Sequence, residues 1–153
     1  MKKNILVVVG TGKFDELIKA VDKIAGKLKD NIIMQIGNGK YIPKNCKYFR
    51  YKPSLEKEYK DSWIVISHGG AGSIYELLKK NKKIIGVANI NRTDTHQEEI
   101  LKALSEDNFL IWCKDLNKVS NCIEKAKKYQ FKKYKVPKCR IHEKITEFLK
   151  CVG

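Results

Sequence analysis

The chain has 153 residues, of which 42% are hydrophobic and 32% are charged, so it can fold as one domain and is not a wholly disordered chain. Its net charge of +15 implies an acidic partner: nucleic acid, an anionic membrane surface or an acidic protein. Five cysteines without a CxxC pair argue against zinc and are expected to be reduced thiols. The first apolar run, residues 5–9, is too short for a signal-peptide core, so we expect a cytoplasmic protein.

Apolar runs and helical repeats alternate along the chain. Ile5–Val9 is continuously apolar and β-branched, which is typical of a strand buried on both faces of a parallel sheet. Apolar residues from Phe14 to Leu28 then recur with a period of 3.6 residues, which predicts a helix. Further strands are expected at 32–36, 48–51, 63–67, 84–87 and 109–113, and further helices at 55–59, 73–80, 95–106, 116–128 and 142–150.

This order predicts an α/β fold. We expect a single Rossmann-like open parallel sheet with helices on both faces. One domain would span residues 1–153, with a basic helical tail from about residue 114 that carries twelve Lys/Arg and four Asp/Glu. Ligands of such sheets bind at the carboxyl ends of the strands.

The stretch WIVISHGGAGSIYELL, Trp63 to Leu78, reads as a strand, a glycine turn and a helix. A helix N-terminus with free N–H groups binds anions, and glycines let a phosphate approach the backbone. His68 could donate to a phosphate oxygen, and Ser73 could cap the helix or bind the same anion. Glu76 follows one turn later: its carboxylate suits the hydroxyls of a ribose, but a capping box with Ser73 explains it equally well.

Two other strand ends carry polar residues. Gly10-Thr11-Gly12 forms a GxG turn without the rest of a dinucleotide fingerprint, so it is either a phosphate site or a plain tight turn. The segment NINRTDTHQ, residues 89–97, opens a helix at Thr95, and a helix cap alone is sufficient to explain this threonine. His96 and Gln97 are placed to reach a phosphate or a sugar.

The sequence VISHGGAGSIYELL, followed by THQEEILKAL, resembles the C-terminal, donor-binding half of GT-B glycosyltransferases. The likeness is to the Alg13-like members of glycosyltransferase family 28, with the MurG C-terminal domain a more distant relative. VVVGTGKFDELIKAV is similar to the opening of the same group, and the resemblance covers roughly Ile5 to Asp115.

The resemblance implies a glycosyltransferase subunit whose donor is a UDP-sugar of the UDP-N-acetylglucosamine type. It implies no metal and no cofactor other than this substrate. The acceptor site and the catalytic base would lie on a membrane-anchored, Alg14-like partner, so the chain alone would be inactive. The donor-binding residues implied are Gly10, Thr11, Gly12, His68, Gly69, Gly70, Ala71, Gly72, Ser73, Glu76, Thr95, His96 and Gln97.

The basic segment Lys127–Arg140 has seven positive charges interleaved with three aromatic residues. It suits an anionic membrane, single-stranded nucleic acid or a solvated linker, and a lipid-linked acceptor favours the membrane over nucleic acid. The protein is then expected at the cytoplasmic face of a membrane, held by its partner. A non-catalytic nucleotide-binding module and a nucleic-acid-binding protein remain the alternatives.

Overall fold

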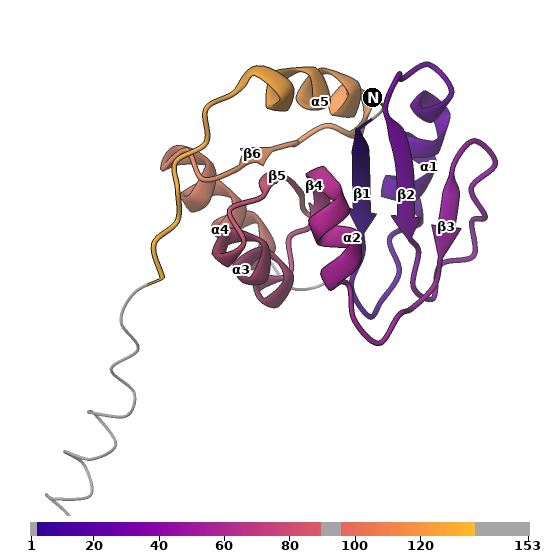
Figure 1. The fold of residues 1–153 in the computed structure, drawn as a ribbon, viewed down its shortest axis with the longest axis horizontal. Coiled ribbons are helices and arrows are strands. Elements are labelled where there is room, and N and C mark those ends of the chain that lie inside the picture. The colour runs from indigo at the N-terminus through magenta and orange to yellow at the C-terminus, as the bar shows by residue number, and fades with distance from the viewer. Residues whose placement is uncertain (1–2, 90–95, 137–153) are drawn as a thin grey trace, which may run out of the picture.

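Six parallel strands form one sheet in the computed structural model, which describes residues 3–89 and 96–136 (Figure 1). Their order across the sheet is β3-β2-β1-β4-β5-β6. This confirms the predicted open parallel sheet. The strands are β1 (Asn4–Val8), β2 (Asn31–Gln35), β3 (Lys47–Phe49), β4 (Ser62–His68), β5 (Lys83–Val87) and β6 (Ile111–Trp112).

The strand order reverses between β1 and β4. The chain moves outward from β1 through β2 to β3, then returns to the other side of β1 with β4. Val8 at the end of β1 is in register with Gln35 on one side and with Ser67 on the other. The turns after β1 and β4 therefore lie side by side at the switch point, where open α/β sheets bind their ligands.

Helices cover both faces of the sheet. Ile5 and Val7 pack in a core with α1 and α5, whereas Leu6 and Val8 pack in a second core with α2, α3 and α4. Adjacent side chains of a strand point to opposite faces, so a strand covered on both faces reads as an unbroken apolar run. The helices are α1 (Asp15–Ala25), α2 (Glu56–Asp61), α3 (Ala71–Lys79), α4 (His96–Glu106) and α5 (Val119–Lys128), and a 3-10 turn, η1 (Leu116–Lys118), precedes α5.

Some boundaries differ from those predicted. Helix α3 begins at Ala71 rather than at Ser73, because Gly70 is extended and its carbonyl already accepts a hydrogen bond from Ile74 N at 3.0 Å. Within the described residues, the basic tail is helical as far as Lys128 and extended from residue 129 to residue 136. Thr95 and the helix predicted at 142–150 lie outside the described residues. None of the helices within residues 3–89 and 96–136 is long and apolar enough to cross a membrane.

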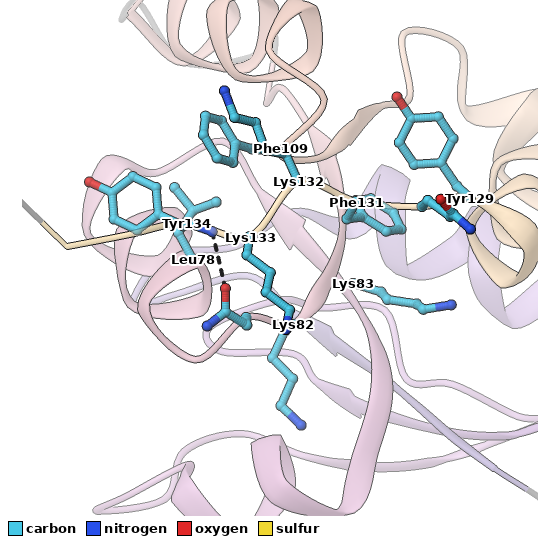
Figure 2. A pocket seen from close by; sticks show the side chains of 11 residues that line it. Leu78, Lys82, Lys83, Phe109, Tyr129, Phe131, Lys132, Lys133 and Tyr134 are labelled. Atoms are coloured by element: carbon cyan, nitrogen blue, oxygen red, sulfur yellow. Dashed lines mark hydrogen bonds between the residues drawn. The ribbon is translucent and has the colours of Figure 1, made fainter.

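After α5 the chain runs as an extended strap, residues 129–136, past the amino ends of β5 and β6 (Figures 1 and 2). Two asparagines with positive φ, Asn81 after α3 and Asn108 after α4, hold it. Asn108 O accepts from Lys132 N at 2.9 Å, and Asn81 Oδ1 accepts from Tyr134 N at 3.1 Å. The strap is therefore a fixed part of the domain.

The strap and the start of β5 enclose a pocket of about 460 Å³, and Figure 2 shows the side chains that line it. Four lysines contribute to it, from residues 82, 83, 132 and 133. Burial, and then the charge of Lys80, lower the pKa of Lys82. The ammonium of Lys83 lies over the ring of Trp63, at 5.4 Å from its centroid. This pocket opens at the edge of the sheet opposite the two glycine turns.

Candidate functional site

The side chain of His68 joins the two glycine turns. It stands at the end of β4, and its Nδ1 accepts a hydrogen bond from Gly70 N at 3.0 Å. A Cβ added to Gly10 would lie 2.5 Å from His68 Nε2, and one added to Gly70 would lie 2.2 Å from His68 Cε1. Gly10 also has a φ of +72°, which favours glycine. Both glycines are thus needed to make room for the imidazole.

The hydrogen bond from Gly70 fixes the tautomer of a neutral His68. Nδ1 is the acceptor, so the proton of the neutral ring is on Nε2. Nε2 lies 3.5 Å from Ser73 Oγ, on the first turn of α3. In this tautomer Nε2–H is the donor toward Ser73 Oγ, and the serine hydroxyl can donate onward at the start of this helix.

The first turn of α3 has the form of an anion site. Its N-cap, Gly70, has no side chain to bond the free N–H groups, and the next two residues, Ala71 and Gly72, are exposed. The positive end of the helix dipole adds to these donors. A Cβ on Gly72 would meet nothing within 4 Å, so the described residues leave that approach open.

Glu76 lies one turn into α3, and the structure rejects the capping box as its explanation. Ser73 is the third residue of the helix and not its N-cap, so Glu76 is not at the position that bonds back to the cap. Glu76 is half-buried near Tyr59. Burial, and then the charge of Glu76, raise the pKa of Tyr59 to about 12.

Gln35, which the sequence reasoning missed, holds the turn after β1. Its side chain is buried, accepts from Val9 N at 2.9 Å, and donates to Gly10 O at 2.7 Å and to Arg50 O at 3.1 Å. Tyr51 adds a hydrogen bond from its hydroxyl to Thr11 O at 3.0 Å. A polar residue inside the apolar run IIMQI was the signal that could have revealed Gln35.

A cavity of about 180 Å³ opens between the turn after β1 and α3. Gly10, Thr11 and Ser73, all predicted site residues, line it together with Tyr51 and Tyr59. Residues from the turn after β1 and from the first turn of α3 therefore line one cavity. Gly12 lies deeper in the loops, where its carbonyl accepts from Asn38 N at 3.0 Å.

The side chains of His96 and Gln97 lie in different environments, one exposed and the other buried. Gln97 is buried against the backbone of the second turn, because a Cβ on Gly69 would lie 2.8 Å from Gln97 Cβ. Its Oε1 accepts from Asn89 N at 2.9 Å, and Asn89 Nδ2 donates to Lys13 O at 3.1 Å. Gln97 and Asn89 thus tie the end of β5 to both turns. The side chain of His96 is 74% exposed and lies 3.3 Å from Glu99 Oε2.

The family model of the glycosyltransferase family 28 C-terminal domain matches residues 4–151. The chain belongs to this family. A human relative, "UDP-N-acetylglucosamine transferase subunit ALG13", is 36% identical over 124 residues, which are 72% of this chain and 11% of that protein. An N-acetylglucosamine transferase of Thermosipho melanesiensis, which acts on a pyrophosphoryl-undecaprenol, is 30% identical over 131 residues, 82% of this chain and 39% of that protein. The family 28 domain thus spans a minor part of the length of both relatives.

Solved structures confirm the fold of this family 28 domain. MurG of Acinetobacter baumannii superposes with a TM-score of 0.68 at 19% identity, over 84% of this chain and 43% of that one. A solution structure of ALG13 gives a TM-score of 0.63 at 18% identity and covers 94% of each chain. The predicted resemblance to the glycosyltransferase family 28 C-terminal domain, and to its fold, is confirmed.

Proposed function

We propose that this family 28 domain is the donor-binding subunit of a two-component glycosyltransferase. It binds a UDP-sugar of the UDP-N-acetylglucosamine type and works with a membrane-anchored, Alg14-like subunit that binds a membrane- or lipid-linked acceptor. The observation that carries the proposal is the meeting of two glycine turns at His68, at the switch point of the sheet. The names of the human and Thermosipho relatives support the donor sugar.

The described donors explain how such a site would favour transfer. Negative charge develops on the diphosphate as the glycosidic bond breaks, and fixed donors stabilise it. His68 Nε2–H, Ser73 Oγ and the N–H groups from Ala71 to Ser73 are the donors that would hold it. Glu76 would accept from the ribose hydroxyls, and the Gly10–Gly12 turn would form the facing wall.

The remaining predicted residues take supporting roles in this proposal. Gln97 would fix the second turn from behind, through its contact with Gly69, while Thr95 and His96 would contact the donor from the start of α4. Neither a metal nor a further cofactor is proposed, because the helix N-terminus and the side-chain donors supply the charge stabilisation. The catalytic base would come from the partner, and no residue of this chain is assigned to that role.

Titration calorimetry with UDP and UDP-N-acetylglucosamine tests the donor site. Glu76→Ala should weaken binding about tenfold, equivalent to ~1.4 kcal/mol, because a carboxylate that accepts hydrogen bonds is lost. Glu106→Ala, at an exposed position on α4, is the control. Unchanged affinity of the Glu76 variant would show that the ribose assignment is wrong, and no binding by the wild-type chain would overturn the donor site itself.

Co-expression with a membrane-anchored acceptor-binding subunit tests the two-component arrangement. Sugar transfer should require both chains. Donor binding without transfer in the presence of that subunit would instead identify a non-catalytic nucleotide-binding module. The protein is expected at the cytoplasmic face of the membrane, through this subunit.

The basic segment Lys127–Arg140 is proposed to add contact with an anionic membrane. Lys127 is already paired with Asp30 at 2.6 Å and with Glu124 at 2.9 Å, so the lysines beyond it would supply the contact. The aromatic rings of the strap pack on the domain and on one another, as between Tyr129 and Phe131, which disfavours base stacking. Salt-sensitive binding to anionic but not to neutral liposomes is the expected result. Absence of binding to both kinds of liposome would exclude the membrane contact.

A further inference from the structure

The pocket between the strap and the start of β5 has a one-sided charge. Lys82 and Lys83 come to it from the start of β5, and Lys132 and Lys133 come from the strap (Figure 2). The described residues that line it include no Asp or Glu, although the chain has 17 of them. This lining therefore brings four ammonium groups to a space of about 460 Å³ and no carboxylate.

These four lysines differ from others in the domain in what they contact. Lys127 Nζ, just before the strap, lies 2.6 Å from Asp30 Oδ2 and so has its charge balanced. None of the four pocket lysines forms an ion pair with a carboxylate of the described residues. Lys82 Nζ donates instead to the carbonyl of Ser62, at 2.8 Å. A carbonyl is neutral, so it holds this ammonium group without balancing its charge.

The surroundings of Lys82 oppose its charge. Burial lowers the pKa of its ammonium group and the charge of Lys80 lowers it further, whereas Asp61, which raises the pKa, has the smallest effect of the three. An anion beside an ammonium group favours its charged form. A bound anion would therefore offset a repulsion that the described residues leave in place.

The same end of the pocket offers hydrogen-bond donors in a fixed frame. The ammonium group of Lys82 has three N–H donors, and the carbonyl of Ser62 occupies one of them. Asn81 Oδ1 already accepts from Tyr134 N at 3.1 Å, so the NH2 group is the part of this amide that can bind a ligand. A ligand with several acceptor oxygens matches these donors.

Among anions, a phosphomonoester matches the pocket better than a carboxylate or a nucleic acid. It carries a charge of about −1.5 to −2 at pH 7 and three strong acceptor oxygens, whereas a carboxylate carries a single charge. Single-stranded nucleic acid needs open ring faces for stacking. Here the rings of Phe109 and Tyr134 meet edge to face, with centroids 5.6 Å apart, and the ammonium group of Lys132 lies over Phe109.

We propose that this pocket binds a phosphomonoester dianion, with Lys82 and Lys83 on one side of it and Lys132 and Lys133 on the other. The site is separate from the donor site, because it opens at the opposite edge of the sheet. Two sources carry this chemistry: the headgroup of an anionic lipid and a free phosphate ester. For the lipid, the inference rests on the membrane contact proposed above, and it adds two lysines from outside the segment Lys127–Arg140.

Backbone NMR of the isotope-labelled full chain, titrated with glycerol phosphate, locates the site. Excess UDP is added first, so that the first turn of α3 is occupied and does not compete for the probe. The amide signals of residues 81–83 and 130–134 should then shift with a saturable dependence on glycerol phosphate.

Charge-removing variants test the role of the lysines. Lys132→Gln with Lys133→Gln, at two exposed positions, should weaken binding of glycerol phosphate about tenfold or more, because two charges beside the phosphate are lost. The matched control is Lys128→Gln with Lys135→Gln, which removes two exposed charges of the same segment outside the pocket and should leave the affinity unchanged. Lys82→Gln should act like the first pair, although it lies outside the basic segment.

Vesicles distinguish the two sources of the phosphate. Phosphatidic acid presents a phosphomonoester, whereas phosphatidylserine does not, so phosphatidylcholine vesicles with either lipid at equal negative charge are compared. Stronger binding to phosphatidic acid, lost in the pocket variants and kept in the control, would assign the site to a lipid headgroup. Shifts by glycerol phosphate at the pocket, without binding to either vesicle, would assign it to a free phosphate ester and would refute the membrane contact instead.

Two results would overturn the proposal. The first is that glycerol phosphate shifts no signal within residues 81–83 and 130–134, or shifts only those of the first turn of α3. The second is that the pocket variants and the control lose binding to the same extent, so that the four lysines contribute only general charge. Binding of UDP is measured in the same samples, so a failure of the donor site is seen separately.

Discussion

The imidazole of His68 occupies the space that a side chain at residue 10 would need: a Cβ there would lie 2.5 Å from Nε2. The turn after β1 therefore approaches the turn after β4 through a glycine, and the histidine fills the gap. Nδ1 is held by Gly70 N at 3.0 Å, so the ring is fixed from both sides. One alanine substitution can test this relationship.

Gly10→Ala should displace His68 and weaken UDP-sugar binding about tenfold or more. It should also destabilise the fold by about 1–3 kcal/mol, because φ is +72° and a non-glycine residue is strained there. Urea unfolding and titration calorimetry would measure the two effects. Gly26→Ala is the control: φ is −67° and a Cβ meets nothing within 4 Å, so a gain of about 0.4–1 kcal/mol is expected. If the two variants had the same stability and the same UDP-sugar affinity, the contact between Gly10 and His68 would not shape the site.

Gln35→Leu should destabilise the protein by about 2–4 kcal/mol while preserving volume in the core. The substitution removes the partners of Val9 N, Gly10 O and Arg50 O, and buried backbone groups left without partners are costly. A lower urea midpoint with an unchanged slope is the expected measurement. Asn31→Leu, at an exposed position of the same strand, should stay within about 0.5 kcal/mol of the wild type. A Gln35 variant as stable as this control would show that the amide does not hold the turn.

The layers of the fold were predictable because buried parallel strands leave a strong signal. Residues 5–9 and 63–66 are unbroken apolar runs, and helical periodicity separates them, so the sheet followed from local pattern. Boundaries were less predictable where backbone geometry decides them. Gly70 begins α3 by being extended, a conformation that any residue adopts, so Ser73 was the more obvious cap.

The residue types of the site were predictable from the sequence, but the contacts between those residues were not. Glycines and a histidine at the end of an apolar run indicate a ligand turn wherever they occur. That His68 would lie against Gly10 depends on β1 and β4 being neighbours, which is a property of the topology. Likewise, Gln97 and His96 are adjacent in sequence, yet helix geometry buries one and exposes the other.

Acid should destabilise the protein partly through Asp22. Burial alone would raise the pKa of this carboxyl, but hydrogen bonds from Lys44 N, the Tyr41 hydroxyl and Asn45 N outweigh it, so the pKa is lower than its ordinary value of 3.8. A depressed pKa stabilises the fold above the unfolded value near 4, and this stabilisation is lost as the pH falls through the folded value.

Urea unfolding from pH 7 to pH 2.5 would measure this contribution. Asp22→Asn should cost about 2 kcal/mol at pH 7, since hydrogen bonds to a charge are lost, and should flatten the fall in stability below pH 4. Asp107→Asn, at an exposed carboxylate, is the matched control. An Asp22 variant that keeps the full acid-induced loss would place the pH dependence elsewhere.

Cys122 should be more reactive than Cys46. A hydrogen bond from the Cys113 thiol lowers the pKa of Cys122, against the opposing effect of burial, whereas burial and the charge of Asp22 raise the pKa of Cys46 to about 12. The thiolate is the nucleophile, so the rate of alkylation of Cys122 by iodoacetamide should rise at a lower pH than that of Cys46, which should stay slow up to pH 9. Mass spectrometry of the peptides gives both rates. Cys113→Ala should move the Cys122 midpoint upward, and Cys113→Ser, which keeps a donor, should move it less. If both substitutions leave the midpoint in place, Cys113 is not what activates Cys122.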